Sequence, residues 1–227
     1  VGRIPFDAEK ERGAVKDVLE RAMSAKVAPR LLVAAESLSP ITTLEGLPAA
    51  LKDALPGWRV RSIYAERVFW EKAPPPSRGF DITITKEQIK RNPCIAADIL
   101  TDTWLEFMPG VVLVASHGNR DLAGYLLPLR RPPLKVGKPF YGWFKRLRNA
   151  PPVVLVTTGC NTAQPERYFL GRRAWLEGGH NWEERPCVLE EALRRFAVCA
   201  FGNTRGAWFT HGWLSPRDGG CVSLSYY

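Results

Sequence analysis

The stretch GVVLVASHGN, at residues 110–119, contains an unbroken apolar run that is followed by Ser116 and then by a histidine-glycine pair. An apolar run without polar alternation is typical of a strand covered on both faces of a parallel sheet. The stretch PPVVLVTTG at 151–159 has the same character and leads directly into Cys160. A third run, AVCAFGN, occupies 197–203. These stretches predict three buried strands of one sheet.

The segments around these runs alternate between helical and extended patterns. Residues 7–26 space their apolar side chains as an amphipathic helix does, and RLLVAA at 30–35 is a short buried-strand pattern. Further elements are expected as follows: helices at 47–55, at 188–196 and, with a break near Pro93, at 85–107, and a strand at 58–65. Strands that alternate with helices predict an α/β fold with a mostly parallel central sheet and helices on both sides. The stretches 118–150 and 161–187 are expected to be long loops, and loops of that length are typically functional.

The composition and charge limit the class of protein. The chain has 227 residues, of which 45 % are hydrophobic, which suits one α/β domain or two closely packed subdomains. The formal net charge of +9 raises nucleic acid or another anionic surface as a partner. The densest basic cluster, between Arg130 and Arg148, is interleaved with Pro and Gly rather than set along one helix. That pattern is typical of a solvated loop surface, so a nucleic-acid-binding domain is the weaker interpretation.

The cysteines and the apolar runs exclude further classes. Five cysteines, an odd number without C-x-x-C spacing, argue against a zinc site and against a fully paired disulfide framework. At least one thiol is therefore expected to be free. No apolar run approaches the roughly 20 residues that span a bilayer, so no membrane span is expected.

Two of the predicted strands end in side chains that cooperate in nucleophilic catalysis. His117 follows the first and Cys160 follows the second, and sites in parallel sheets form beyond the carboxyl ends of the strands. A cysteine is mostly protonated at neutral pH, so it needs a nearby imidazole to take its proton. Gly118 has no Cβ to obstruct a substrate carbonyl, so its N–H and that of Cys160 are expected to form an oxyanion hole. Gly159 is expected to let the backbone turn sharply at the nucleophile.

Each of these residues also has another interpretation. A His-Gly pair is a weak signal by itself, and a second pair, His211-Gly212, follows another apolar stretch and makes His211 an alternative base. A cysteine after a buried strand is often a small core residue. A cysteine-phosphatase loop is excluded because Arg167 lies one position too far from Cys160 for the pattern C-x₅-R.

The strand ends resemble those of the gingipain-like cysteine peptidases, a family of the caspase, gingipain and legumain clan. In that clan one apolar strand ends in His-Gly and a later one ends in the nucleophilic cysteine. Further stretches are similar to the gingipain branch and keep its order along nearly the whole chain: VGRIP (1–5) with RLLVAAE (30–36), AERVFWEK (65–72) with ITKEQI (84–89), VVLVTTGCNTAQPE (153–166) and VLEEALRRFAVCAFGNTRGAW (188–208).

The resemblance implies a caspase-like three-layer α/β/α sandwich with His117 as acid and base, Cys160 as nucleophile, and the N–H groups of Gly118 and Cys160 as oxyanion donors. It also implies that Trp208 lines the specificity pocket, although a core or hairpin aromatic is an equally good interpretation of that residue. The expected organisation is a single peptidase domain over 1–227, with an N-terminal part at 1–109 and the dyad in 110–227. Because VGRIP is normally internal in the family, an upstream subdomain is expected to be missing.

The implied activity is that of a bacterial, secreted or cell-surface cysteine endopeptidase that hydrolyses proteins or peptides, with cleavage after basic residues favoured. No cofactor is expected, although some relatives hold structural calcium, and the sequence shows no cluster of calcium ligands. Two departures concern the site: Gly159 stands where Ala or another small residue is usual, and Asn119-Arg120-Asp121 follows His-Gly in place of small and acidic residues. The alternative function is that of a caspase-like interaction module without peptidase activity.

Overall fold

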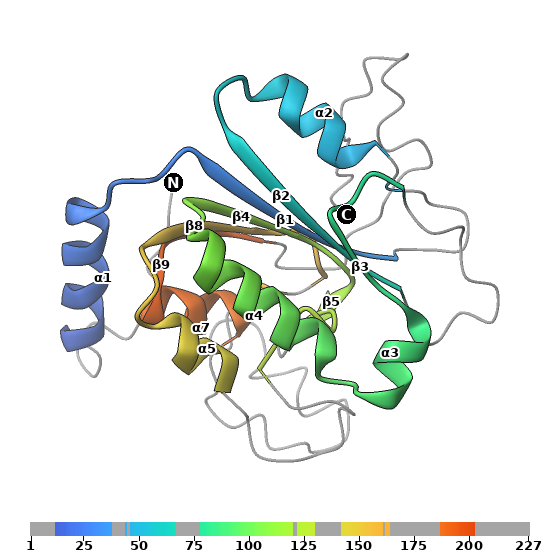
Figure 1. Ribbon diagram of the computed structural model, residues 1–227. Coiled ribbons are helices and arrows are strands. Elements are labelled where there is room, and N and C mark those ends of the chain that lie inside the picture. The colour runs from blue at the N-terminus through green and yellow to red at the C-terminus, as the bar shows by residue number, and fades with distance from the viewer. Residues whose placement is uncertain are drawn as a thin grey trace, which may run out of the picture.

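The computed structural model describes residues 12–37, 44, 46–66, 78–119, 122–129, 142–160, 162–163 and 187–202. Its centre is a six-stranded sheet in the order β3-β2-β1-β4-β8-β9, and every neighbouring pair in that sheet is parallel (Figure 1). The strands are β1 (Arg30–Glu36), β2 (Arg59–Ala65), β3 (Ile82–Ile84), β4 (Val111–Ala115), β8 (Val153–Thr157) and β9 (Ala197–Phe201). The prediction of an α/β fold around a mostly parallel sheet is thus confirmed.

Helices lie on both faces of the sheet. In Figure 1, α2 (Leu47–Ala54) covers one face, whereas α4 (Ile95–Phe107), α5 (Gly142–Leu147) and α7 (Val188–Arg195) cover the other. The short α3 (Lys86–Arg91) precedes α4, and α1 (Arg12–Ser24) packs beside β9 and α7. This arrangement is compatible with a three-layer sandwich.

Alternate residues of the strands contribute to two separate cores, as the period of an extended chain requires. Leu32 and Ala34 of β1 belong to the large core under α4, α5 and α7, whereas Leu31 and Val33 belong to the smaller core under α2. In the large core the rings of Trp104 and Phe196 meet edge to face, 5.2 Å apart. Trp104 belongs to α4 and Phe196 directly follows α7, so this ring contact packs the two helices together on one face of the sheet.

The second face of β8 is covered less fully than its apolar run predicts. Val153, Leu155 and Thr157 are buried, while Val154 and Val156 are only half-buried. Within the described part of the chain, α2 packs on β2 and leaves this side of β8 partly open. The prediction of a strand is confirmed, and its two faces differ in how completely they are covered.

A small antiparallel sheet begins immediately after His117. Its strands are β5 (Gly118–Asn119), β6 (Leu122–Ala123) and β7 (Leu127–Pro128), in the order β5-β6-β7. The stretch 118–150 was expected to be a loop; its described residues instead contain this sheet and α5. β3 was likewise not predicted. Strands of two or three residues are too short to show a period in the sequence.

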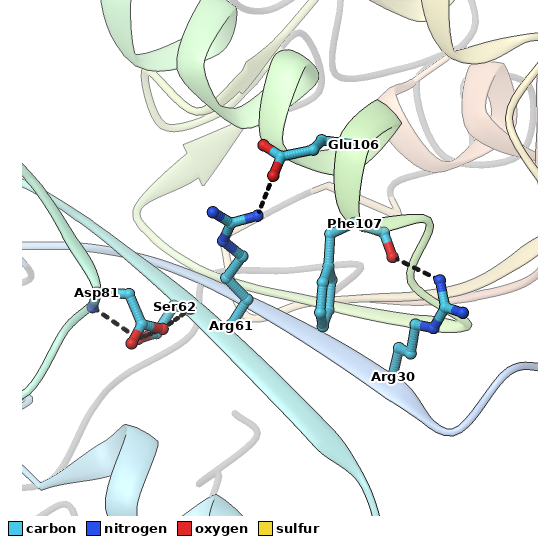
Figure 2. A network of polar contacts seen from close by, with 6 residues as sticks. All are labelled: Arg30, Arg61, Ser62, Asp81, Glu106 and Phe107. Atoms are coloured by element: carbon cyan, nitrogen blue, oxygen red, sulfur yellow. Dashed lines mark hydrogen bonds and ion pairs between the residues drawn. The ribbon is translucent and has the colours of Figure 1, made fainter.

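Polar contacts tie α4 and β3 to β1 and β2 (Figure 2). Arg30 donates to the carbonyl of Phe107 at 3.0 Å, and Arg61 forms an ion pair with Glu106 at 3.0 Å. The carboxylate of Asp81 accepts hydrogen bonds from the backbone N–H of Ser62 at 2.7 Å and from its hydroxyl at 2.8 Å. The two arginines belong to the amino-terminal halves of β1 and β2, so their contacts stabilise the sheet away from its carboxyl edge.

The guanidinium of Arg21 connects α1 to the end of α7. Its Nη1 donates to the carbonyls of Leu193 at 2.7 Å and Ala197 at 3.1 Å, and its Nη2 donates to the carbonyl of Arg194 at 3.3 Å. The last carbonyls of a helix have no partner within it, and a positive charge there is favourable. Burial lowers the pKa of Arg21, an effect that nearby Asp17 opposes. Arg21 thus closes the carboxyl end of α7.

Candidate functional site

The winding of the sheet reverses between β1 and β4. The chain runs outward from β1 through β2 to β3, and then returns to the other side of β1 as β4, β8 and β9. In open α/β sheets, ligands bind beyond the carboxyl ends of the strands at the point where the strand order reverses. His117 follows β4, which borders this point, and Cys160 follows the neighbouring strand β8, so both predicted residues come after the carboxyl ends of adjacent strands.

The paired residues of β4 and β8 lie at equal sequence distances from His117 and Cys160. Val111 pairs with Val154 and Val114 pairs with Thr157, an interval of 43 residues that also separates His117 from Cys160. The pairing continues beyond β8, because the N–H of Thr158 donates to the carbonyl of Val114 at 3.0 Å. Neighbouring strands lie about 4.8 Å apart. His117 and Cys160, both half-buried, therefore follow the two strands at matching positions.

Beyond the strands the two backbones approach closely at a pair of glycines. A Cβ on Gly159 would lie 3.0 Å from the Cα and 3.2 Å from the N of Gly118. The chain bends at Gly159, as expected, although the φ of Gly159 is not among the positive values of the described glycines. Its role is to leave room for Gly118. A glycine before Cys160 therefore avoids a clash between a Cβ at this position and the backbone of Gly118.

Two threonine hydroxyls, those of Thr157 and Thr162, support the turn that contains Cys160 from its buried side. The Oγ1 of Thr162, a fully buried residue, lies 2.7 Å from the Oγ1 of Thr157 and donates to the carbonyl of Gly159 at 3.0 Å. The carbonyl of Thr162 accepts from the N–H of Leu189 at 3.4 Å, which ties the turn to the start of α7. Sequence reasoning missed Thr162; the only signal was a threonine two positions after the cysteine.

A buried carboxylate lies at the carboxyl end of β1. Glu36 has no exposed surface, and its Oε1 accepts a hydrogen bond from the N–H of Tyr125 at 2.8 Å. Gly124 has a φ of 61°, and a Cβ there would lie 2.5 Å from Oε2 of Glu36. Since Gly118 pairs with Ala123 in the small sheet, Glu36 anchors the hairpin in which Gly118 is held. Sequence reasoning missed Glu36 as well, although an acidic residue that ends an apolar strand is a recognisable signal.

Several predicted residues lie outside the described part of the chain: Trp208, His211, Arg167 and Cys221. Of the other cysteines, Cys199 is a half-buried free thiol, and Cys94 is a buried free thiol in a small cluster with Trp143. Over the described ranges, no group of three or more His, Cys, Asp and Glu side chains is placed to hold a metal ion. None of the described helices is both long enough and apolar enough to cross a membrane.

The strand order is also that of the doubly wound dinucleotide-binding folds. Those folds hold the cofactor pyrophosphate on a G-x-G-x-x-G turn after the first strand. The residues after β1 read SLSPITTLEG, with a single glycine, so the sequence lacks this phosphate-binding turn. The chain matches no protein-family model, no curated protein and no solved structure.

Proposed function

We propose that the chain is a cysteine peptidase of caspase-like fold in which His117 and Cys160 form the catalytic dyad. The observation that carries the proposal is the shared register of β4 and β8, two neighbouring strands whose carboxyl ends lead into these two residues, with β4 bordering the point where the strand order reverses. A thiol and an imidazole on neighbouring strand ends are what acyl transfer through a cysteine requires. The close approach of Gly118 and Gly159 supports the proposed oxyanion hole, because one donor belongs to Gly118 and the other to the residue that follows Gly159.

The chemistry follows the usual course of thiol acyl transfer. His117 holds the proton of Cys160, and the thiolate attacks the peptide carbonyl carbon to form a C–S bond, while the carbonyl oxygen becomes an oxyanion. The N–H groups of Gly118 and Cys160 stabilise that oxyanion, and one such donor contributes about 3 kcal/mol. His117 then protonates the leaving nitrogen as the C–N bond breaks. Water attacks the thioester, His117 accepts its proton, and the C–S bond breaks to release a carboxylate.

The test is labelling of Cys160 by peptidyl acyloxymethyl ketones with Arg, Lys, Asp or Asn next to the reactive group, followed by mass mapping. Cys160 should be labelled in preference to Cys94 and Cys199, and His117→Ala should abolish the labelling. His211→Ala is the matched control, because it removes the imidazole of the other His-Gly pair and should leave labelling unchanged. Preference for the Arg or Lys probe would support cleavage after basic residues, which the gingipain resemblance favours.

Two outcomes would replace the proposal. In the first, Cys160 does not react with any of the four probes while Cys199 reacts with a simple alkylating agent. The chain is then not a peptidase, and the interaction module becomes the better interpretation. If labelling persists in His117→Ala and disappears in His211→Ala, the base is His211 and the dyad has been assigned to the wrong strand end.

A further inference from the structure

We propose that Thr162 is a positioning residue that fixes the orientation of the Gly159–Cys160 peptide, and with it the direction of the Cys160 N–H. The inference rests on the proposed function and extends it to a residue that touches neither substrate nor reacting atoms. Its basis is the buried hydroxyl pair beneath the nucleophile turn, formed by Thr157 at the end of β8 and Thr162.

The hydrogen atoms available to the pair determine its direction. Each hydroxyl has one hydrogen to donate. Three contacts compete for these two hydrogens. Thr162 Oγ1 lies 2.7 Å from Thr157 Oγ1 and 3.0 Å from the carbonyl oxygen of Gly159. Thr157 Oγ1 lies 3.4 Å from the carbonyl oxygen of Phe201. The two short contacts are satisfied together only if Thr157 donates to Thr162 and Thr162 donates to Gly159. A hydroxyl that accepts one hydrogen bond is a stronger donor in the next, so the chain of two bonds reinforces itself.

Peptide geometry carries this orientation to the nucleophile. A trans peptide is planar, and its C=O and N–H point in opposite directions. The carbonyl of Gly159 is held toward Thr162, whose side chain has no exposed surface. The N–H of the next residue, Cys160, therefore points away from this buried hydroxyl. That is the direction an oxyanion donor must have, because the substrate carbonyl approaches from outside the core.

The surroundings leave the hydroxyl pair little freedom to move. A Cβ on Gly202, just after β9, would lie 2.6 Å from the Oγ1 of Thr157 and 2.7 Å from that of Thr162. The carbonyl of Thr162 is bound by the N–H of Leu189 at the start of α7. The turn is thus enclosed by β8, β9 and α7, and the Gly159 carbonyl is held by a hydroxyl fixed on several sides.

The experiment compares Thr162→Val, which keeps the shape and loses the hydroxyl, with Thr162→Ser, which keeps the hydroxyl. Two reactions of Cys160 are measured in each variant. Alkylation by iodoacetamide needs the thiolate and forms no oxyanion. Reversible inhibition by a peptidyl aldehyde, carrying whichever residue labels best, forms a tetrahedral adduct whose oxygen needs the oxyanion donors. Values of kcat and KM for a matching peptide complete the comparison.

Thr162→Val should weaken aldehyde binding and lower kcat by about 10- to 100-fold, since loss of one oxyanion donor costs about 10² to 10³ in rate. Its alkylation rate and KM should stay within about twofold of wild type, and Thr162→Ser should resemble wild type in every measurement. The inference is overturned if Thr162→Val and Thr162→Ser behave alike, or if alkylation and aldehyde binding fall together.

Thr157→Val provides a second variant in case Thr162→Val does not fold. It removes the donor to Thr162 but leaves Thr162 able to donate to Gly159, so aldehyde binding should weaken in the same direction and by a smaller factor. Unchanged aldehyde binding in a folded Thr157→Val also counts against the inference. Failure of the proposed function looks different: Cys160 of the wild-type chain would react with iodoacetamide and bind no peptidyl aldehyde at all, and the role of Thr162 would fall with it.

Discussion

Gly118 and Gly159 meet backbone to backbone: a Cβ added to Gly159 would lie 3.0 Å from the Cα of Gly118. The two glycines flank the proposed catalytic pair, one directly after His117 and the other directly before Cys160. Their contact means that the two strand ends cannot shift independently. The distance between the proposed base and nucleophile is consequently set by main-chain packing.

Replacing Gly159 with alanine should therefore damage the site more than the fold. The added methyl group pushes against Gly118 and against the Cγ2 of Thr162, also at 3.0 Å, so the backbone of the site must shift by a few tenths of an ångström. Overpacking of this kind costs about 1–3 kcal/mol. We expect labelling of Cys160 by the best peptidyl probe to slow by about 10-fold, because small misplacements of reacting groups are expensive.

The matched control is Gly13→Ala in α1, where a Cβ would meet nothing within 4 Å. Alanine is favoured over glycine in a helix by about 1 kcal/mol, so Gly13→Ala should be neutral or stabilising and should not change labelling. Equal labelling rates for Gly159→Ala and wild type would show that the contact with Gly118 does not determine reactivity.

The second prediction concerns the carboxylate of Glu36. Glu36→Leu leaves the N–H of Tyr125 without its acceptor in a site with no exposed surface, which should lower the free energy of unfolding by about 1–3 kcal/mol. Glu36→Gln keeps an acceptor oxygen and should lose less. Denaturant unfolding measures both variants. A Glu36→Leu variant as stable as wild type would mean that the hairpin holding Gly118 does not depend on this contact.

The third prediction compares how much two polar contacts drawn in Figure 2 contribute to the stability of the fold. Asp81→Ala removes the acceptor of two hydrogen bonds from Ser62, which is fully buried, and should lower stability by about 1–3 kcal/mol. Glu106→Gln breaks an ion pair in which the Glu106 side chain is 70 % exposed, and should change stability by less than about 0.5 kcal/mol. Thermal unfolding measures the stability of both variants. A larger loss of stability in Glu106→Gln than in Asp81→Ala would contradict the prediction. Neither variant should alter the labelling of Cys160.

The sequence predicted the parts of the fold that depend on burial. β4 and β8 were identifiable because a central parallel strand must be apolar along its length, and α4 because its apolar residues recur with a helical period. The two-residue strands of the small sheet and the six-residue helix α5 are too short to show such a period. Their positions follow from packing against α4 and the large core, which the linear sequence does not display.

The sequence points to the candidate site through two residues that follow apolar runs, His117 and Cys160. The structure shows that the strands before them, β4 and β8, are neighbours in the sheet. Glu36 and Thr162 act through contacts with Tyr125, 89 positions away, and with the carbonyl of Gly159. Such contacts depend on the course of the backbone at the strand ends, for which residue type alone gives no rule.

The attachment of α7 at both ends has a consequence for how the domain assembles. One end of this helix binds the turn that contains Cys160 through Leu189, and the other is closed by Arg21, which precedes Leu193 by 172 residues. β1, between β2 and β4, also comes from the early part of the chain. Contacts of such long range form late and slow the folding of a domain. A nascent chain would therefore carry both His117 and Cys160 before the turn that contains Cys160 was fully enclosed, and the proposed reactivity would arise only as α1 docks on α7.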